Sequence, residues 1–361
     1  SRGARPGAPP GGAAGPAGPW GAGAMGEPGW IDVPICEAIL TKDLRIVVAV
    51  DGSAYARSAL TYVTENLLQM DRKAFAQVVH VFDDSKDYLP VSCRKEQLRL
   101  AVDAQLTGSA SAKRYKISWI PKDGVPAGNH ICACISDVEA DYCCIGFHGL
   151  KGAKPNSQQV SSNVLRVLAQ GNSCSVIVIK DEEPSLLPLG RPTRFVVSVS
   201  LNKSSTKAFL DALRLSRPGD EIHVAYIKSY MEREDSDYTA EVRKKYTAFF
   251  SGLKDGGEKV FSKFHDRQTE FCLLSKQRKE TTAESVVRYA DSIEADFIVV
   301  GANAADRVSR GKNPVGAVSM QICLETTRNF IVSNWIDASP RVFESHIRRA
   351  STPVQGERPP R

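Results

Sequence analysis

The feature that most constrains the fold is an internal repeat, whose landmarks recur in the same order along the chain. The segment "RIVVAVDGSAYARSAL" at residues 45–60 returns as "RFVVSVSLNKSSTKAFLDAL" at residues 194–213, offset by 149 positions. "EADYCCIGFHG" at residues 139–149 returns as "EADFIVVGANA" at residues 294–304, offset by 155. A repeat of this length predicts two copies of one folding unit, arranged in tandem.

Two shorter matches complete the repeat. "VVHVF" at residues 78–82 returns as "IHVAY" at residues 222–226, and we take their histidines, His80 and His223, to occupy equivalent strand positions. We interpret both histidines as packed structural residues of a strand. A weaker echo links "CSVIVIK", which ends the first copy, to "NFIVSNW", which ends the second.

Each copy consists of short apolar strands separated by segments of helix length. The strands show almost no polar alternation, as expected where both faces of a parallel sheet are buried. Right-handed crossovers between such strands give a three-layer, doubly wound α/β domain. The strands predicted for the first copy are 46–50, 77–82, 115–120, 142–145 and 176–179, and the helices are 54–68, 94–107, 129–138 and 162–168.

Composition suggests where the domains end. Twenty of the first 24 residues are Gly, Ala or Pro, so this stretch lacks the apolar surface to offset its ordering entropy. Met25 follows it, and the sequence leaves open whether residues 1–24 belong to the native protein. We predict a disordered leader and lead-in at 1–43, a first domain at 44–181, a Pro-rich linker at 182–192, a second, degenerate domain at 193–335 and a basic disordered tail at 336–361.

Charge and cysteine content exclude several classes of function. The net charge of +6 over 361 residues comes largely from the two ends, so we expect no nucleic-acid partner. The nine cysteines include no Cys-x-x-Cys pair, which disfavours a zinc or redox role and fits a reducing, cytoplasmic location. No apolar stretch approaches the roughly 18 residues that span a bilayer, so we expect no membrane association.

Ligands of doubly wound sheets bind beyond the carboxyl ends of the strands, which directs attention to two loops. After the first strand comes Asp51-Gly52-Ser53. The carboxylate can accept hydrogen bonds from ligand hydroxyl or amine groups, while glycine permits a sharp turn and serine can cap the next helix. Capping alone is an equally good interpretation of this turn when it is considered by itself.

The loop after the fourth strand has the composition of an anion-binding loop. "GFHGLKGAKPNSQQVSS" at residues 146–162 carries a glycine every three residues at its start, with Lys151 and Lys154 among them. Glycines let backbone amides approach an anion, and the start of the following helix supplies free N–H donors. The same unit thus predicts a carboxylate and a phosphate-type loop facing each other.

These residues resemble the universal stress protein family. "VVAVDGSAYARSAL" is similar to the family's opening strand and turn, "EADYCCIG" with its Gly-x-His-Gly continuation to the fourth-strand loop, and "SCSVIVIK" to the final strand. The resemblance covers both copies, roughly residues 44–335. It implies a tandem protein of two Rossmann-like domains, each a doubly wound five-stranded parallel sheet with helices on both faces. The family dimerises through the last strand, so we expect an intramolecular pseudo-dimer, with a homodimer also open.

Some family members bind ATP through an Asp after the first strand and a Gly-x-x-Gly, spacer, Gly-Ser/Thr motif. Asp51 matches that Asp, and Gly146 with Gly149 matches Gly-x-x-Gly. After an eleven-residue gap Ser161-Ser162 stands where Gly-Ser is expected, so one glycine is lost. The residues that the resemblance assigns to a nucleotide site are Asp51, Gly52, Ser53, Gly146, Gly149, Lys151, Gly152, Ser161 and Ser162.

The second copy departs further from the motif. Ser200 replaces the Asp, Gly301 is kept and Ala304 replaces the second glycine. After the same gap Gly316-Ala317 lacks the hydroxyl. We therefore predict a vestigial site formed by Ser200, Gly301, Gly316 and Ala317, with a structural or regulatory role.

Two further candidates carry less weight. His148 lies in the glycine loop, but no carboxylate partner is identifiable by spacing, so no catalytic residue is assigned. In the tail, Arg348-Arg349-Ala350-Ser351 fits the pattern that basophilic kinases accept, which makes Ser351 a candidate phosphorylation site.

The sequence thus predicts a cytoplasmic stress-response protein that binds ATP or AMP in its first domain and regulates partner binding. Mg²⁺ would accompany ATP, no other metal is expected, and slow ATP hydrolysis stays open. The first alternative is an interaction or dimerisation scaffold in which both pockets are degenerate. The second is an ATP-pyrophosphatase, which would need a Ser-Gly-Gly-x-Asp-Ser turn that Asp51-Gly52-Ser53 does not supply.

Overall fold

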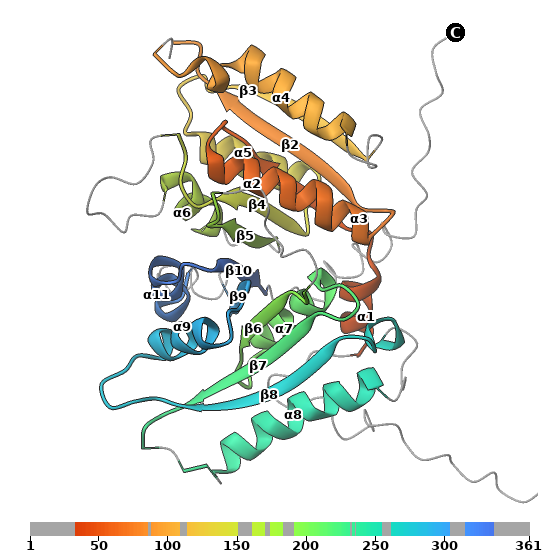
Figure 1. The fold of residues 1–361 in the computed structure, drawn as a ribbon, viewed down its shortest axis with the longest axis vertical. Helices are drawn as coiled ribbons and strands as arrows, with labels where there is room; N and C mark the ends of the chain where they lie inside the picture. The colour runs from red at the N-terminus through yellow and green to blue at the C-terminus, as the bar shows by residue number, and fades with distance from the viewer. Residues whose placement is uncertain are drawn as a thin grey trace, which may run out of the picture.

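A ten-stranded sheet runs through the whole molecule in the computed structural model (Figure 1). Its strand order is β3-β2-β1-β4-β5-β10-β9-β6-β7-β8, and all neighbours are parallel except β5 and β10. The α/β fold class is therefore confirmed. The structure describes residues 33–85, 88–108, 114–150, 161–169, 174–182, 191–231, 233–234, 236–254, 261–303 and 315–335.

The strands fall into two sets with the same internal order, which we call the first half (β1–β5) and the second half (β6–β10). The strands predicted for the first copy are confirmed to within about two residues, because their buried apolar runs are unbroken by turn residues. The observed strands are β1 Arg45–Ala49, β2 Phe75–Phe82, β3 Tyr115–Pro121, β4 Tyr142–Gly146, β5 Ser175–Ile179, β6 Arg194–Ser198, β7 Glu221–Lys228, β8 Gln268–Ser275, β9 Phe297–Ala302 and β10 Asn329–Asn334.

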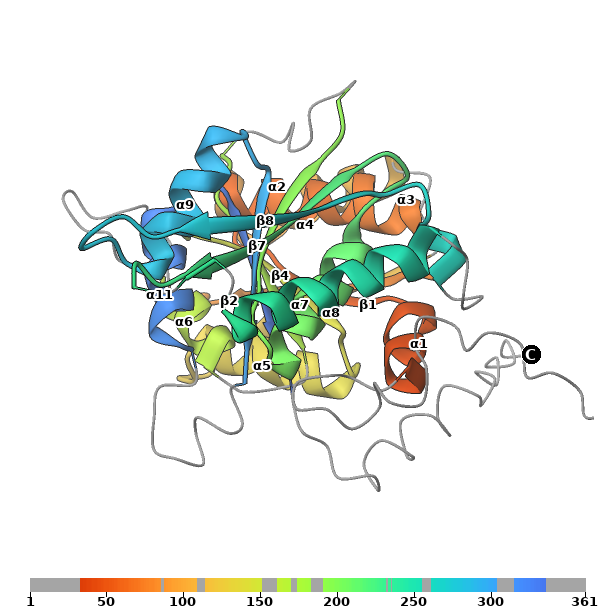
Figure 2. The ribbon, with the colours of Figure 1, turned by 90° about the horizontal axis from the view of Figure 1, so that it is seen from below.

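Helices cover both faces of the sheet, as the second view makes plain (Figure 2). The first predicted helix is continuous but widens into π-type turns at η1 before it ends. The longer helical segments are α1 Val33–Thr41, α2 Ala54–Thr61, η1 Tyr62–Leu67, α4 Lys95–Gly108, α5 Ala127–Asp137, α6 Ser162–Ala169, α7 Lys203–Leu215, α8 Asp237–Lys254, α9 Thr282–Ser292 and α11 Ala317–Glu325, and the short ones are α3 Leu68–Met70, η2 Val91–Cys93 and η3 Phe261–Phe264. No helix among the described residues has the length and apolar character needed to span a membrane.

Two apolar cores lie on opposite faces of the sheet and both extend across the two halves. Alternate residues of one strand point into different cores: Ile46 and Val48 face the core beneath α2, α4, α7 and α8, while Val47 faces the core beneath α5, α6, α9 and α11. Side chains buried on both faces explain why the strands lack polar alternation.

The assignment of residues 33–41 to a disordered lead-in is wrong. These residues form α1, which buries Cys36 and Leu40 and packs against α7 of the second half. The carbonyl of Lys42, just beyond the helix, accepts a hydrogen bond from Arg214 Nη2 at 2.6 Å. The apolar residues of this short segment, next to a Gly/Pro-rich leader, gave too weak a compositional signal, because the surface that stabilises them lies about 170 residues away.

The halves meet at β5 and β10, which pair antiparallel with Ile177 opposite Ile331. Lys180, at the end of β5, donates hydrogen bonds to the carbonyls of Cys323 (2.5 Å) and Thr326 (2.6 Å) in the second half. Its ammonium also lies 4.0 Å from the centre of the Phe147 ring. Burial lowers the pKa of Lys180 from 10.5 to about 8.

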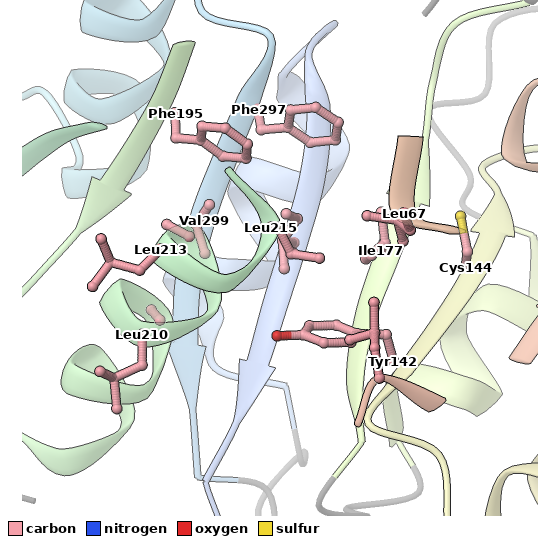
Figure 3. Packing of buried hydrophobic residues seen from close by; sticks show 14 of the residues in the cluster. Leu67, Tyr142, Cys144, Ile177, Phe195, Leu210, Leu213, Leu215, Phe297 and Val299 are labelled. Carbon is pink, nitrogen blue, oxygen red and sulfur yellow. The ribbon is translucent and has the colours of Figure 1, made fainter. Parts of the chain in front are cut away.

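A buried polar network also crosses this joint. Tyr142 of β4 donates a hydrogen bond to Asp211 of α7 at 2.6 Å, and Ser175 Oγ donates to the same carboxylate at 2.6 Å. Lys207 of α7 completes the network with a 2.5 Å ion pair. Figure 3 shows the phenol of Tyr142 directed across the joint toward the second half.

The strand register corrects the equivalence predicted for two histidines. Val79 pairs with the fifth residue of β1, and Ala225 with the fifth residue of β6. By position in the sheet, His223 is therefore the counterpart of Gln77, and the counterpart of His80 is Tyr226. The equivalence of the two histidines is three residues out of step with the sheet, because both registers place β-branched residues at matched positions.

Candidate functional site

The Asp51-Gly52-Ser53 turn joins the carboxyl end of β1 to helix α2. Gly52 has φ of +87°, a left-handed conformation that favours glycine, and a Cβ there would lie 3.1 Å from Cys93 Sγ. Ser53 is the N-cap residue of α2: its hydroxyl accepts from Ala56 N at 3.2 Å. The same hydroxyl donates to the carbonyl of His148 at 3.3 Å, so the cap also holds the loop that follows β4.

Asp51 links the two loops that the sequence predicts to face each other. Its Oδ1 accepts a hydrogen bond from Ser53 N (3.0 Å), and its Oδ2 accepts one from Leu150 N (3.1 Å). Strands β1 and β4 are parallel neighbours, which places their carboxyl ends at one edge of the sheet. The structure thus brings Asp51 and the β4 loop into direct contact, and each carboxylate oxygen retains acceptor capacity for a further partner.

The two glycines of Gly-x-x-Gly have different structural roles. A Cβ on Gly146 would lie 2.7 Å from Tyr55 Cβ and 2.9 Å from Ala56 N, so this glycine admits the first turn of α2. Apart from its chain neighbours, the only described residue that a Cβ on Gly149 would meet within 4 Å is Asp51, whose Oδ2 would lie 2.7 Å away. Gly146 is required by helix packing, whereas Gly149 is required by the carboxylate.

His148 packs against aromatic rings, and the Glu182 carboxylate is close enough to act on it electrostatically. Its ring lies edge-on to Tyr55, with centroids 5.4 Å apart, and against Phe147 at 4.4 Å. Burial lowers the pKa of His148 below its ordinary value, and the charge of Lys180 lowers it further while that of Glu182 raises it. A neutral imidazole in this position suits ring packing.

The distal serines lie at the start of α6. The Ser161 hydroxyl accepts from Val164 N at 3.4 Å, a capping contact, and Ser162 is the first helical residue, with an exposed side chain. The helix therefore presents its N-terminal N–H groups at the end of the loop. Lys151, Lys154 and Gly152, assigned to the same site, and Ser351 of the tail lie outside the described residues.

The corresponding turn of the second half is closed by hydroxyl and amide contacts. Ser200 Oγ accepts from Asn202 Nδ2 at 2.6 Å and lies 3.1 Å from Ser205 Oγ. Asn202 caps α7 through Ser205 N at 2.7 Å. No carboxylate takes the place of Asp51 in this described turn. Gly316 precedes α11 without a side-chain cap, and Ala317 begins that helix.

Three groups that hold the Asp51-Gly52-Ser53 turn were not predicted from the sequence, because they lie outside the motif residues. Arg57 Nη1 donates to the carbonyl of Gly52 at 2.6 Å, and Cys93 Sγ lies 3.7 Å from the same oxygen. Leu150 contributes only its backbone N–H, a contact that no residue-type pattern can reveal. A basic residue four positions after a capping serine was the one available signal, for Arg57.

A protein-family model matches the first half of the chain. The model of the Universal stress protein family matches residues 44–180, which confirms the predicted resemblance for this part of the chain. The universal stress protein of Archaeoglobus fulgidus DSM 4304 is similar in structure with a TM-score of 0.53, at 16% identity over 80% of this chain and 98% of its own. A protein of Pseudomonas aeruginosa UCBPP-PA14 named as a universal stress protein has a TM-score of 0.51, at 12% identity over 87% and 100%. Both likenesses extend through the second half and show a shared fold. No curated protein matches the sequence.

Proposed function

We propose that the first half binds an adenine nucleotide, ATP or AMP, and that occupancy regulates the binding of partner proteins. The observation that carries the proposal is the Asp51 carboxylate, held between its own turn and the β4 loop by two backbone hydrogen bonds. A carboxylate at this edge of a parallel sheet is suited to the hydroxyl and amino groups of a nucleoside. The match of residues 44–180 to a family with nucleotide-binding members supports the same conclusion.

The remaining groups suit the anionic part of such a ligand. Gly149 keeps the loop backbone close to Asp51, and the α6 N-terminus, begun by Ser161 and Ser162, offers N–H donors and a favourable dipole. Lys151, next in the chain, would supply positive charge for phosphates. Mg²⁺ would accompany ATP through the phosphates.

The proposed output is a change in partner binding rather than catalysis. The loop residue with acid–base chemistry, His148, is packed among rings, and its pKa is lowered by burial. The nucleotide would instead act on the β4 loop, because Asp51, which it would contact, also accepts a hydrogen bond from Leu150 N of that loop. Rearrangement of the β4 loop is the expected consequence of binding, and exposes a different surface to partners.

Calorimetric titration of purified protein with ATP and with AMP, with and without Mg²⁺, tests the proposal. We expect one site per chain, and we expect Asp51→Asn to weaken binding at least about tenfold, the equivalent of about 1.4 kcal/mol. Ser200→Ala, at the matched position of the second half, is the control and should leave the affinity unchanged. Equal affinity for wild type and Asp51→Asn would contradict the assigned site.

A scaffold without nucleotide is the second candidate, and one observation favours it. Ser53, Ser161 and both oxygens of Asp51 already have backbone partners within the chain. Mass spectrometry of small molecules released from the purified protein separates the candidates. If no nucleotide co-purifies and none binds in the titration, the scaffold is the better description.

A further inference from the structure

Three residues with metal-ligating side chains meet on the outer strands of the second half, far from the Asp51 turn in the sheet order. His223 of β7 is paired in register with Glu270 of β8, and Cys272 lies two residues further along β8. Residues two apart on a strand share a face, so Glu270 and Cys272 project on the same side. The register places His223 beside them.

The distances between their ligand atoms are those of groups that can share one ion. His223 Nδ1 lies 3.5 Å from Glu270 Oε2 and 3.9 Å from Cys272 Sγ. All three ligand atoms lie within 4.8 Å of one another. His223 and Cys272 are largely buried, and Glu270 is exposed, which leaves a side of the cluster open to solvent.

The opposite edge of the imidazole faces a carboxylate. His223 Nε2 lies 3.6 Å from Glu221 Oε2, and Arg194 pairs with that same oxygen at 2.8 Å. A metal-binding histidine commonly donates its second N–H to a carboxylate, which fixes the tautomer and orients the ring. Glu221 lies on the Nε2 side of the ring, so a proton on Nε2 would face this carboxylate and leave the Nδ1 lone pair on the side of Glu270 and Cys272.

We propose that His223, Glu270 and Cys272 form a zinc site. Imidazole nitrogen, thiolate sulfur and carboxylate oxygen are the three ligand types of protein zinc sites, and a thiolate disfavours Mg²⁺ and Ca²⁺. Three protein ligands leave a fourth tetrahedral position for water or for Tyr289 of α9. The Tyr289 hydroxyl lies 3.0 Å from His223 Nδ1 and 2.9 Å from Cys272 Sγ.

The first half supplies an internal comparison. At the matched sheet positions it has Gln77 for His223, Lys116 for Glu270 and Ser118 for Cys272, as the strand registers show. Gln77 Nε2 donates to Ser118 Oγ at 2.5 Å, so a simple hydrogen bond satisfies the fold at these positions. The fold therefore does not require metal-ligating residues at these positions. The second half nevertheless has three of them where the first half has an uncharged Gln–Ser hydrogen bond.

The competing interpretation is a hydrogen-bonded cluster closed by Tyr289. In such a cluster Tyr289 would donate to His223 Nδ1 and accept from the Cys272 thiol, and the hydrogen bonds would not involve Glu270. The two interpretations therefore differ in their dependence on Glu270, an exposed side chain that can be changed without disturbing the core.

Zinc titration of the metal-free, reduced full-length protein against a chelating dye tests the proposal. We expect one tight equivalent of zinc in wild type. Glu270→Gln, His223→Gln and Cys272→Ser should each weaken it at least about tenfold, since even outer partners of metal ligands contribute 10–100-fold. The last two variants install the residues of the first half, so they are compatible with the fold. Cys134→Ser, a buried cysteine of α5, is the control and should not change zinc affinity.

Cobalt supplies a readout that nonspecific binding does not give. Co²⁺ bound to a thiolate shows a near-ultraviolet sulfur-to-metal band, which we expect in wild type and Cys134→Ser and not in Cys272→Ser. Circular dichroism checks that each variant is folded. If Cys272→Ser does not fold, the zinc affinity of Glu270→Gln tests the proposal in its place. The proposal is overturned if wild type binds no zinc, or if Glu270→Gln and His223→Gln bind it as tightly as wild type does.

Discussion

The carboxyl ends of β4 and β9 carry glycines at matched positions, and the two halves use them in the same way. A Cβ on Gly146 would meet Tyr55 and Ala56 within 2.9 Å, and one on Gly301 would meet the backbone of Ser204 within 2.3 Å. Both glycines admit the helix that follows the first strand of their half. Retention of Gly301 in a half without the Asp is thus a requirement of packing.

Gly149 teaches the opposite lesson. Its missing side chain makes room for Asp51, and the second half has Ser200 in place of that Asp and Ala304 in place of this glycine. The carboxylate and the second glycine are therefore both present in the first half and both absent from the second. The difference between the halves separates what the fold needs from what the proposed ligand needs, and the following predictions test that separation.

The largest effect is expected at the joint, where the halves differ most. Asp211→Asn leaves Lys207 without its buried counter-charge and should lower the free energy of unfolding by about 3–5 kcal/mol. Tyr62 occupies the matched position of the first half, where it contacts Phe297 with ring centroids 5.3 Å apart. Tyr62→Phe keeps that contact and should cost about 1 kcal/mol or less. Urea denaturation measures both variants, and similar losses would contradict this asymmetry.

The same network predicts acid sensitivity. Burial alone would raise the pKa of Asp211, but the charge of Lys207 and hydrogen bonds from Lys207, Ser175 and Tyr142 hold it below its usual range. A carboxyl whose pKa is lowered on folding stabilises the fold fully above its unfolded pKa of about 4 and loses that contribution as pH falls through the folded value. The stability difference between wild type and Asp211→Asn should therefore shrink below about pH 4.

The next effect tests the shared role of Gly146 and Gly301. Alanine at either position overpacks the contact with the following helix and should destabilise the protein by about 1–3 kcal/mol, with the larger loss at Gly301. Thermal or urea unfolding measures both. A loss at Gly146 alone would show that the two glycines are not equivalent.

A smaller effect concerns Lys180 at the joint. Because burial lowers its pKa to about 8, the folded state releases this proton before the unfolded state does. The free energy of unfolding therefore rises as the pH increases from about 8, the pKa of Lys180 in the folded state, to about 10.5, its pKa in the unfolded state. This gain is lost again on acidification. Relative to Lys180→Met, wild type should gain on the order of 1 kcal/mol across that window. A difference that stays flat with pH would contradict the burial of the ammonium.

The smallest effect on stability is expected for Gly149→Ala. Its Cβ would meet one carboxylate oxygen of a half-buried, rotatable side chain, so the cost should be below about 1 kcal/mol. Nucleotide affinity should nevertheless fall about tenfold, because Asp51 must move. A stability loss as large as that of Gly146→Ala, with affinity unchanged, would reverse the roles assigned to the two glycines.

The sequence predicted the strands well for physical reasons. Runs such as Val47–Val48 and Val178–Ile179 are buried on both faces, so hydrophobicity alone marks them. Asp51 and Gly149 were also predictable, because the loops after neighbouring parallel strands converge at one edge of the sheet.

Features that depend on distant partners were not predictable. Helix α1 is stabilised by α7, and the two outer-strand residues Glu270 and Cys272 acquire meaning only through the register that brings His223 beside them. The alignment of His80 with His223 was wrong because a short apolar motif matches itself in several registers. The local hydrophobic pattern therefore identified the strands of the first copy but not which residues lie beside them in the sheet.

The antiparallel pairing of β5 with β10 has a consequence for how the two halves can change. In a symmetric dimer of identical chains, every substitution near the axis appears twice, so an acidic residue there must be tolerated on both sides. Here Asp211 contacts Tyr142 through a hydrogen bond, while Tyr62, at the matched position, contacts Phe297 through its ring. One contact between the halves is therefore polar and its counterpart is apolar. Covalent fusion releases the chain from symmetry, and each half can specialise without imposing its choice on the other.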